Sequence, residues 1–146
     1  MTNIAFHFNA PDKLHYACRL MRKAVQQDAR VVVWVPDAQL KALDDLLWSF
    51  SNTDFLAHCR ADSPDQQINA SPLVLCGQTM QFPSLPAAFI LVNLCADVCA
   101  SYKLFERVIE IVSLDENDRQ SARLRWKFYA QQGHDIVRHD LKLKDS

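Results

Sequence analysis

The chain has 146 residues, of which 49% are hydrophobic and 23% are charged, enough apolar material for one globular domain with a core. Its formal net charge of −1 argues against a protein that coats nucleic acid or a membrane surface by bulk electrostatics. No apolar run reaches the roughly 18 residues that span a membrane, and the N-terminus lacks the features of a signal peptide. We therefore expect a cytoplasmic protein with no membrane association, folded as one domain over residues 1–146 with a C-terminal tail at 133–146.

Short apolar runs alternate with amphipathic segments, a pattern typical of a largely parallel sheet covered by helices. Residues 3–8 predict the first strand. Apolar residues then recur at helical spacing up to about Asp28, which predicts a helix with Pro11 in its first turn. The mostly β-branched run 31–35 shows no alternation, so it predicts a central strand buried on both faces.

A second helix is expected over residues 37–50, with Asp37 as its N-cap. A short strand over residues 55–58 follows. The polar, turn-rich stretch 61–71 predicts a surface loop. Residues 73–76 then predict another strand.

In the second half, the apolar run 89–94 predicts a strand, preceded by a proline segment at 83–86 that excludes regular structure. A short helix near residues 97–103 and a strand at 107–112 follow. A long basic helix is expected to open at Asp115 or Asn117 and to stop near Gly133. The weakly alternating residues 135–143 predict an edge strand.

The polar face of that last helix carries both cations and a tryptophan. At about 100° per residue, Arg119, Arg123 and Trp126 gather on one side with Lys127 at its edge. The apolar residues of the helix gather on the opposite side: Leu114, Leu124 and Phe128, with Ser121. A tryptophan among cations, away from the core, suits the capture of an anionic group with an apolar or aromatic end.

A purely structural role for this face also stays open. Basic residues in the C-terminal half of a helix are favoured by the helix dipole by about 0.3–1 kcal/mol each, so a solvated face would carry the same stripe. The segment after Gly133 could also cover the tryptophan.

A second pair of aromatics lies near the helix expected at 37–50. Trp48 projects roughly 120° away from the apolar side of that helix, and Phe55 follows in a short connection. Two large aromatics near one edge predict a protein-interaction hot spot, because tryptophan is enriched where partners dock. Either ring could instead pack beneath the polar loop at 60–71.

The chain contains only Gly77 and Gly133, so neither a GxGxxG dinucleotide loop nor a GxxxxGK[ST] phosphate loop is present. The first strand-to-helix turn, residues 8–12, has no glycine where a pyrophosphate would require one. The expected fold is therefore α/β: a single-domain, Rossmann-like three-layer fold with a mostly parallel sheet and no nucleotide-binding glycine loop. No cofactor is expected.

Catalytic and metal-binding patterns are also lacking. The adjacent pairs His134–Asp135 and His139–Asp140 do not in general adopt the geometry of a catalytic triad. His7 is expected to make a structural hydrogen bond, and His15 and His58 have no second ligand at metal spacing. The five cysteines include no CxxC pair, so they are expected to be small core residues in a reducing compartment: Cys18, Cys59, Cys76, Cys95 and Cys99. The sequence predicts a protein that is not an enzyme.

Five blocks in order and at matching spacing carry a family resemblance: Leu43–Trp48, Phe55–His58, Phe89–Leu94, Phe105–Val112 and Ala122–Tyr129. Over the stretch from the first strand to Gly133, the chain resembles the chi subunit of bacterial DNA polymerase III. The resemblance implies a non-catalytic accessory protein of the clamp loader in DNA replication. It also implies a psi subunit as partner, and recognition of the acidic, phenylalanine-ending tail of the single-stranded-DNA-binding protein, through which DNA is contacted indirectly.

The resemblance also assigns residues. The tail site would use Arg119, Arg123, Trp126 and Lys127, with Val112 lining the pocket for the terminal ring. The psi-facing surface would include Trp48 and Phe55, and in some lineages a similar surface could serve a helicase instead. Three residues depart from the family pattern: Arg119 replaces a lysine, Trp126 a tyrosine and Ala57 a proline.

Two other functions remain as alternatives. One is a doubly wound enzyme that acts on a small phosphorylated substrate, with the basic stripe holding phosphate. The other is a direct single-stranded nucleic-acid binder that stacks bases on Trp126.

Overall fold

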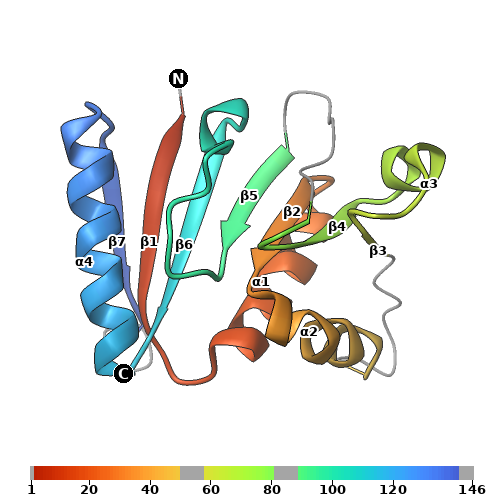
Figure 1. Cartoon of the computed structure of the whole chain (residues 1–146), viewed down its shortest axis with the longest axis horizontal. Coiled ribbons are helices and arrows are strands. Elements are labelled where there is room, and N and C mark those ends of the chain that lie inside the picture. The colour runs from red at the N-terminus through yellow and green to blue at the C-terminus, as the bar shows by residue number, and fades with distance from the viewer. Residues whose placement is uncertain (1, 50–57, 81–88, 142–146) are drawn as a thin grey trace.

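The computed structural model describes residues 2–49, 58–80 and 89–141, in which seven strands form one sheet (Figure 1). The strands are β1 (Asn3–Ala10), β2 (Arg30–Val35), β3 (Cys59–Arg60), β4 (Leu73–Gly77), β5 (Phe89–Asn93), β6 (Arg107–Ser113) and β7 (Ile136–Asp140). The helices are α1 (Lys13–Gln26), α2 (Asp37–Ser49), α3 (Asp65–Ala70), the 3-10 helix η1 (Tyr102–Leu104) and α4 (Glu116–Gln131). The strand order is β3-β4-β2-β5-β6-β1-β7.

Helices cover both faces of the sheet, which confirms the predicted three-layer, Rossmann-like α/β fold. On one face, α1 and α2 pack over a core that includes Met21 and Leu43. On the other, α4 and η1 pack over a core that includes Tyr129 and Tyr102. Every pairing between the described strands is parallel, so this part of the sheet is wholly rather than mostly parallel.

The central strands are the apolar runs that the sequence predicted. β2 lies between β4 and β5, and its residues Val31–Val35 are all buried. Strands buried on both faces need no polar alternation, which is why this run lacks it. The C-terminal prediction is also confirmed, because β7 lies at the edge of the sheet and pairs only with β1 among the described strands.

The starts of α1 and α2 both differ from the prediction. Pro11 lies before α1, because Asp12 is the N-cap and its carboxylate accepts the N–H of His15 at 3.1 Å. Asp37 is the first residue of α2 rather than its cap. Its carboxylate accepts hydrogen bonds from the backbone N–H and the hydroxyl of Thr79, so it ties α2 to the loop after β4.

Two predicted segments are corrected by the structure. The stretch 61–71 is not only a loop: it contains α3, which forms because its Ile68 can be buried against the core at 4% exposure. β3 begins at Cys59, and residues 50–57 lie outside the described part of the chain, so the strand expected at 55–58 stays a prediction. Where a helix was expected at 97–103, the structure has only the short 3-10 helix η1 (Tyr102–Leu104). The proline segment 83–86 also lies outside the described residues.

The ends of α4 agree with the prediction, but the buried face of α4 does not. Asp115 is the N-cap, and Gly133 follows the helix with φ +85°, a left-handed conformation that suits glycine. Leu124 and Phe128, which periodicity placed opposite the basic face, are 67% and 38% exposed. The residues of α4 that are buried are Ala122, Arg125 and Tyr129.

A buried ion pair explains why this face of α4, rather than the expected one, packs on the sheet. Arg125 is 2% exposed, and its Nε donates to Glu110 Oε1 on β6 at 2.9 Å. The other carboxylate oxygen of Glu110 accepts the hydroxyl of Tyr129 at 2.6 Å and the amide of Asn93 at 3.0 Å. Arg125 Nη1 donates to the carbonyl of Ala96 at 2.9 Å. A polar residue thus faces the core because its partner is there.

We expect Arg125→Ala to lower the free energy of unfolding by about 3–5 kcal/mol, because Glu110 would then be buried without its cation. Urea denaturation followed by circular dichroism measures the change. Arg123→Ala is the matched control, since it removes the same side chain from a position that is 60% exposed and should leave stability nearly unchanged. Equal losses in the two variants would contradict the role of the buried pair.

Candidate functional site

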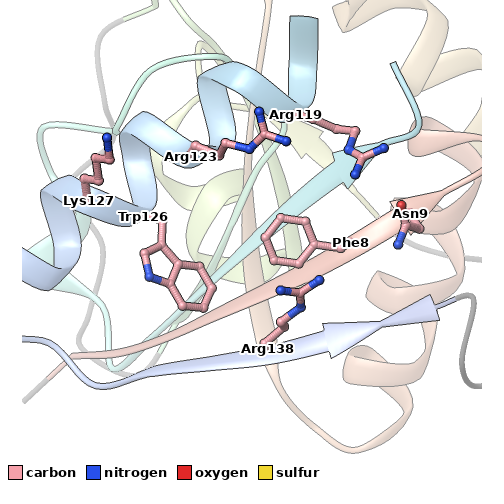
Figure 2. Close-up of a pocket in the computed structure, with 7 residues that line it drawn as sticks. All are labelled: Phe8, Asn9, Arg119, Arg123, Trp126, Lys127 and Arg138. Atoms are coloured by element: carbon pink, nitrogen blue, oxygen red, sulfur yellow. The ribbon is translucent and has the colours of Figure 1, made fainter. Parts of the chain in front are cut away.

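A pocket of about 370 Å³ lies between α4 and the strands β1 and β7 (Figure 2). We call it the basic pocket, and its lining residues are Phe8, Asn9, Arg119, Arg123, Trp126, Lys127 and Arg138. All four residues that helical periodicity singled out on the polar face of α4 line it. The structure therefore brings these four side chains together at a concave surface.

Helix geometry explains the arrangement of the cations. Arg119, Arg123 and Lys127 follow one another at intervals of four residues, so they form a row along one flank of α4. Figure 2 shows Arg119 and Arg123 above the strands, whereas Lys127 points away from Phe8. The two arginines are thus the cations of this row that are closest to the centre of the site.

Trp126 lies at the border of the core rather than away from it, which corrects the sequence-based expectation. Its indole is half-buried and packs on Phe6 and Phe8, with ring centroids 5.1 Å and 6.1 Å apart. It lies about 100° around α4 from Arg125, which points into the core. One part of the ring is therefore held by the protein while another part lines the basic pocket.

Phe8 and Arg138 are site residues that the sequence analysis missed. Phe8 stacks on Phe6 with ring centroids 5.7 Å apart, and the guanidinium carbon of Arg138 lies 4.9 Å from the Phe8 ring centroid. Phe6 and Phe8 share a face of β1 because strand residues two apart point the same way. Arg138 is paired with Phe6 across the sheet. Only this pairing of β7 with β1 could have indicated Arg138.

Asn9 reaches the pocket through a local irregularity of β1. Its φ is +67°, a left-handed conformation that asparagine tolerates better than most residues, and the pairing with β6 shifts between His7 and Ala10. The Asn9 amide donates to Asp140 at 2.8 Å. This bond links the end of β1 to the end of β7 at one end of the pocket.

The pocket keeps a positive character. Arg123 lies 3.6 Å from Glu116, but both side chains are about 60% exposed, and such pairs contribute little. Among the described residues, neither Arg119 nor Lys127 has an ion-pair partner. Arg138 lies 3.9 Å from Asp140, at the limit of an ion pair. The pocket therefore offers cationic groups around an apolar surface made by Phe8 and Trp126.

Val112 does not line this pocket. It is 0% exposed and belongs to the core beneath α4. Phe8 and Trp126, and not Val112, supply the apolar lining of the basic pocket.

The chain matches the family model of the DNA polymerase III chi subunit, HolC, over residues 1–137. It is also 32% identical over 130 residues to the DNA polymerase III subunit chi of Pseudomonas aeruginosa, and the match covers 88% of this chain and 87% of that protein. The chain belongs to the DNA polymerase III chi subunit family.

In this chi family member, Trp48 lies on α2, apart from the basic pocket, and is 58% exposed. Its ring lies 4.8 Å from that of His58, whose Nε2 is 2.6 Å from Asp44 Oδ1. The indole is thus supported on one side and presented to solvent, as expected for an interaction residue. Phe55, the second residue predicted for this surface, lies outside the described residues.

Two further histidines and the cysteines of this chi family member have structural surroundings. His7 Nδ1 lies 2.5 Å from the Tyr16 hydroxyl, which confirms the structural hydrogen bond, and His134 Nε2 lies 2.8 Å from the Tyr102 hydroxyl. All five cysteines are buried and free, as predicted for core residues. Burial raises the pKa of the Cys18, Cys76 and Cys95 thiols to about 12, so they stay protonated near neutral pH.

No group of three or more His, Cys, Asp or Glu side chains among the described residues could hold a metal ion. In the same part of the chain, every helix is too short or too polar to cross a bilayer.

Asp118 attaches the start of α4 to the rest of the chi fold. Its Oδ2 accepts the N–H of Ser113 at 2.8 Å, and Lys13 Nζ lies 3.1 Å from its Oδ1. Burial acts to raise the pKa of Asp118, but the Ser113 hydrogen bond and the Lys13 charge outweigh it. The pKa therefore lies below its usual value of 3.8.

We expect the protein to lose stability in acid, because protonation of Asp118 weakens its contacts with Ser113 and Lys13. Because the pKa of Asp118 is lower in the folded state, its stabilisation is present above about pH 4 and is lost as the pH falls through the folded-state pKa. Asp118→Asn should therefore lose less stability on acidification than the unmodified chain does. Urea unfolding at a series of pH values measures this, and parallel pH profiles for the two proteins would refute it.

Proposed function

We propose that this chain is a non-catalytic accessory subunit of the DNA polymerase III clamp loader. In this proposal it links the loader to single-stranded-DNA-binding protein by binding the acidic C-terminal tail of that protein. It also pairs with a psi-type subunit, and it works in the cytoplasm. The observation that carries the proposal is the basic pocket, where cations of α4 and β7 surround the apolar surface of Phe8 and Trp126.

The chemistry of the pocket suits a chain terminus that is acidic and ends in an aromatic ring. Arg119 and Arg123 would bind carboxylates, because guanidinium groups match the planar carboxylate geometry. A phenylalanine ring would pack against Phe8 and Trp126, whose positions are already fixed by Phe6. Arg138, over the Phe8 ring, would meet the terminal carboxylate or a neighbouring acid.

The free energies expected for these contacts predict a modest affinity for the tail. Exposed ion pairs contribute about 0.2–1 kcal/mol each, and burial of one aromatic side chain contributes about 1.5–3 kcal/mol. These terms together fall short of the roughly 8 kcal/mol of a micromolar complex, before any favourable hydrogen bonds. Many tails displayed on coated DNA would raise the effective concentration and compensate for a weak single contact.

We expect Arg123→Ala to weaken binding of an acidic, phenylalanine-ending peptide by up to about fivefold and Trp126→Ala to weaken it by roughly tenfold. Arg123 supplies a carboxylate contact, and Trp126 supplies the apolar wall. Fluorescence anisotropy with the labelled peptide measures the affinity, which should also fall as salt increases because the ion pairs are exposed.

Two controls define this experiment. Arg60→Ala removes an exposed arginine of β3, far along the strand order from β7, and should leave peptide affinity unchanged. A peptide without the terminal phenylalanine should bind more weakly to the unmodified chain. If Arg123→Ala and Trp126→Ala both bind the full peptide as the unmodified chain does, the basic pocket is not the tail site.

The surface around Trp48 is the proposed contact for the psi-type subunit, together with Phe55, which follows α2 in the sequence. The exposed indole, supported by His58, has the properties of a hot-spot residue. A helicase partner at the same surface is the alternative occupant. Because Trp48 is on α2 and the basic pocket is formed by α4, β1 and β7, both partners could bind at once.

We expect Trp48→Ala to abolish stable capture of a psi-type partner while peptide binding at the basic pocket stays unchanged. Affinity capture with the purified variant, followed by the same peptide titration, measures both. Loss of both activities would indicate a damaged fold, and retention of partner capture would show that Trp48 is not at the interface. Leu104→Ala, an exposed apolar residue of η1, is the control for loss of surface hydrophobicity.

A further inference from the structure

A second cavity of about 600 Å³ lies on the face of the sheet opposite α4, between α1 and the strands β1, β5, β6 and β7. We call it the α1 groove. Its cationic lining residues are Arg19 and Lys23 from α1 and Arg107 from β6, and its aromatic ones are Tyr16, His7 and His139. Within the described part of the chain, no acidic residue lines it.

The net charge of the whole chain does not indicate this local concentration of positive charge. α1 contains four basic residues, Lys13, Arg19, Arg22 and Lys23, and no aspartate or glutamate. α2, which packs on the same face, contains three aspartates, Asp37, Asp44 and Asp45. Opposite charges are thus segregated on neighbouring helices, and α1 presents a positive surface although the whole chain carries −1.

The cations of the groove are available to a ligand. Arg19, Lys23 and Arg107 are exposed, and none of the three forms an ion pair with a described residue. In contrast, Lys13 is held by Asp118. Arg19 and Lys23 are four residues apart on α1, so their side chains lie on the same side of the helix about 6 Å apart along its axis.

Rings lie beside these cations. The Tyr16 hydroxyl is 2.5 Å from His7 Nδ1, and the His7 and His139 ring centroids are 4.7 Å apart. Arg19 lies over the Tyr16 ring at 5.7 Å. His7 and His139 are direct partners in the pairing of β1 with β7, so the sheet fixes their positions. Cations next to fixed ring surfaces match a polyanion that carries flat bases.

We propose that the α1 groove binds the sugar–phosphate backbone of single-stranded DNA. In this proposal Arg19, Lys23 and Arg107 contact phosphates, and the Tyr16 side of the groove contacts a base. DNA is favoured over other polyanions because the chain belongs to a family of DNA polymerase III subunits. A single strand is favoured because its bases are free to contact the rings beside the cations, whereas the bases of a duplex are paired and stacked inside it.

The α1 groove is independent of the basic pocket. Arg138 and His139 are consecutive residues of β7, and consecutive strand residues point to opposite faces of the sheet. Arg138 lines the basic pocket and His139 lines the α1 groove. The two sites are therefore separated by the sheet, and a tail peptide and a DNA strand could be held at the same time.

The test is fluorescence anisotropy of a labelled oligo(dT) with the full chain at low salt. We expect weak binding whose logarithm falls with the logarithm of salt concentration with a slope of about −2, as expected for three phosphate contacts. Arg19→Glu/Lys23→Glu should weaken oligo(dT) binding by about tenfold or more. The same double variant should bind the acidic, phenylalanine-ending peptide as the unmodified chain does.

The matched control is Arg123→Glu/Lys127→Glu, which reverses two charges at the same spacing on the opposite face of the sheet. It should retain oligo(dT) binding, and it should lose peptide binding if the basic pocket is the tail site. The two double variants therefore separate failure of this proposal from failure of the proposed function. Circular dichroism of both verifies that they are folded.

Three results would overturn the proposal. The unmodified chain could fail to bind oligo(dT) at low salt. Both double variants could lose oligo(dT) binding equally, which would indicate only a general charge effect. An acidic peptide could displace the oligonucleotide from the Arg123→Glu/Lys127→Glu protein, in which case the groove is a peptide site.

Discussion

The buried ion pair between Glu110 and Arg125 is the constraint on which the binding surface depends. Both side chains are almost completely excluded from water, which is costly unless each charge is compensated. Tyr129, Asn93 and the carbonyl of Ala96 provide that compensation with hydrogen bonds. The pair connects α4 to the middle of β6 and fixes which side of the helix faces the sheet.

The orientation of α4 then decides what each flank of the helix presents. With Arg125 pointing inward, Trp126 lies about a quarter-turn away at the edge of the core, and Arg119 and Arg123 lie further round. Leu124 and Phe128 are left exposed on the other flank. The cations of the basic pocket are thus positioned by an arginine that does not line it.

The edge strand β7 completes both concave surfaces of the molecule. Its pairing with β1 places Arg138 beside Phe8 on the α4 side and His139 beside His7 on the α1 side. Positive charge therefore occurs on both faces of a sheet in a chain whose net charge is −1. Local segregation of charge, rather than the total, governs which ligands each face can bind.

The sequence by itself determined the α/β class, the central strands, the limits of α4 and the grouping of Arg119, Arg123 and Trp126 on one side of α4, because these depend on local periodicity and capping. Only the tertiary structure decided which face of α4 is buried. Periodicity treats every arginine as polar, and it cannot show that Arg125 meets a carboxylate 15 residues away in the core. The same limit hid Arg138 and Phe8, whose proximity arises from strand pairing between the two ends of the chain. Long-range pairing of charges and strands is a property of the folded chain, and no short segment encodes it.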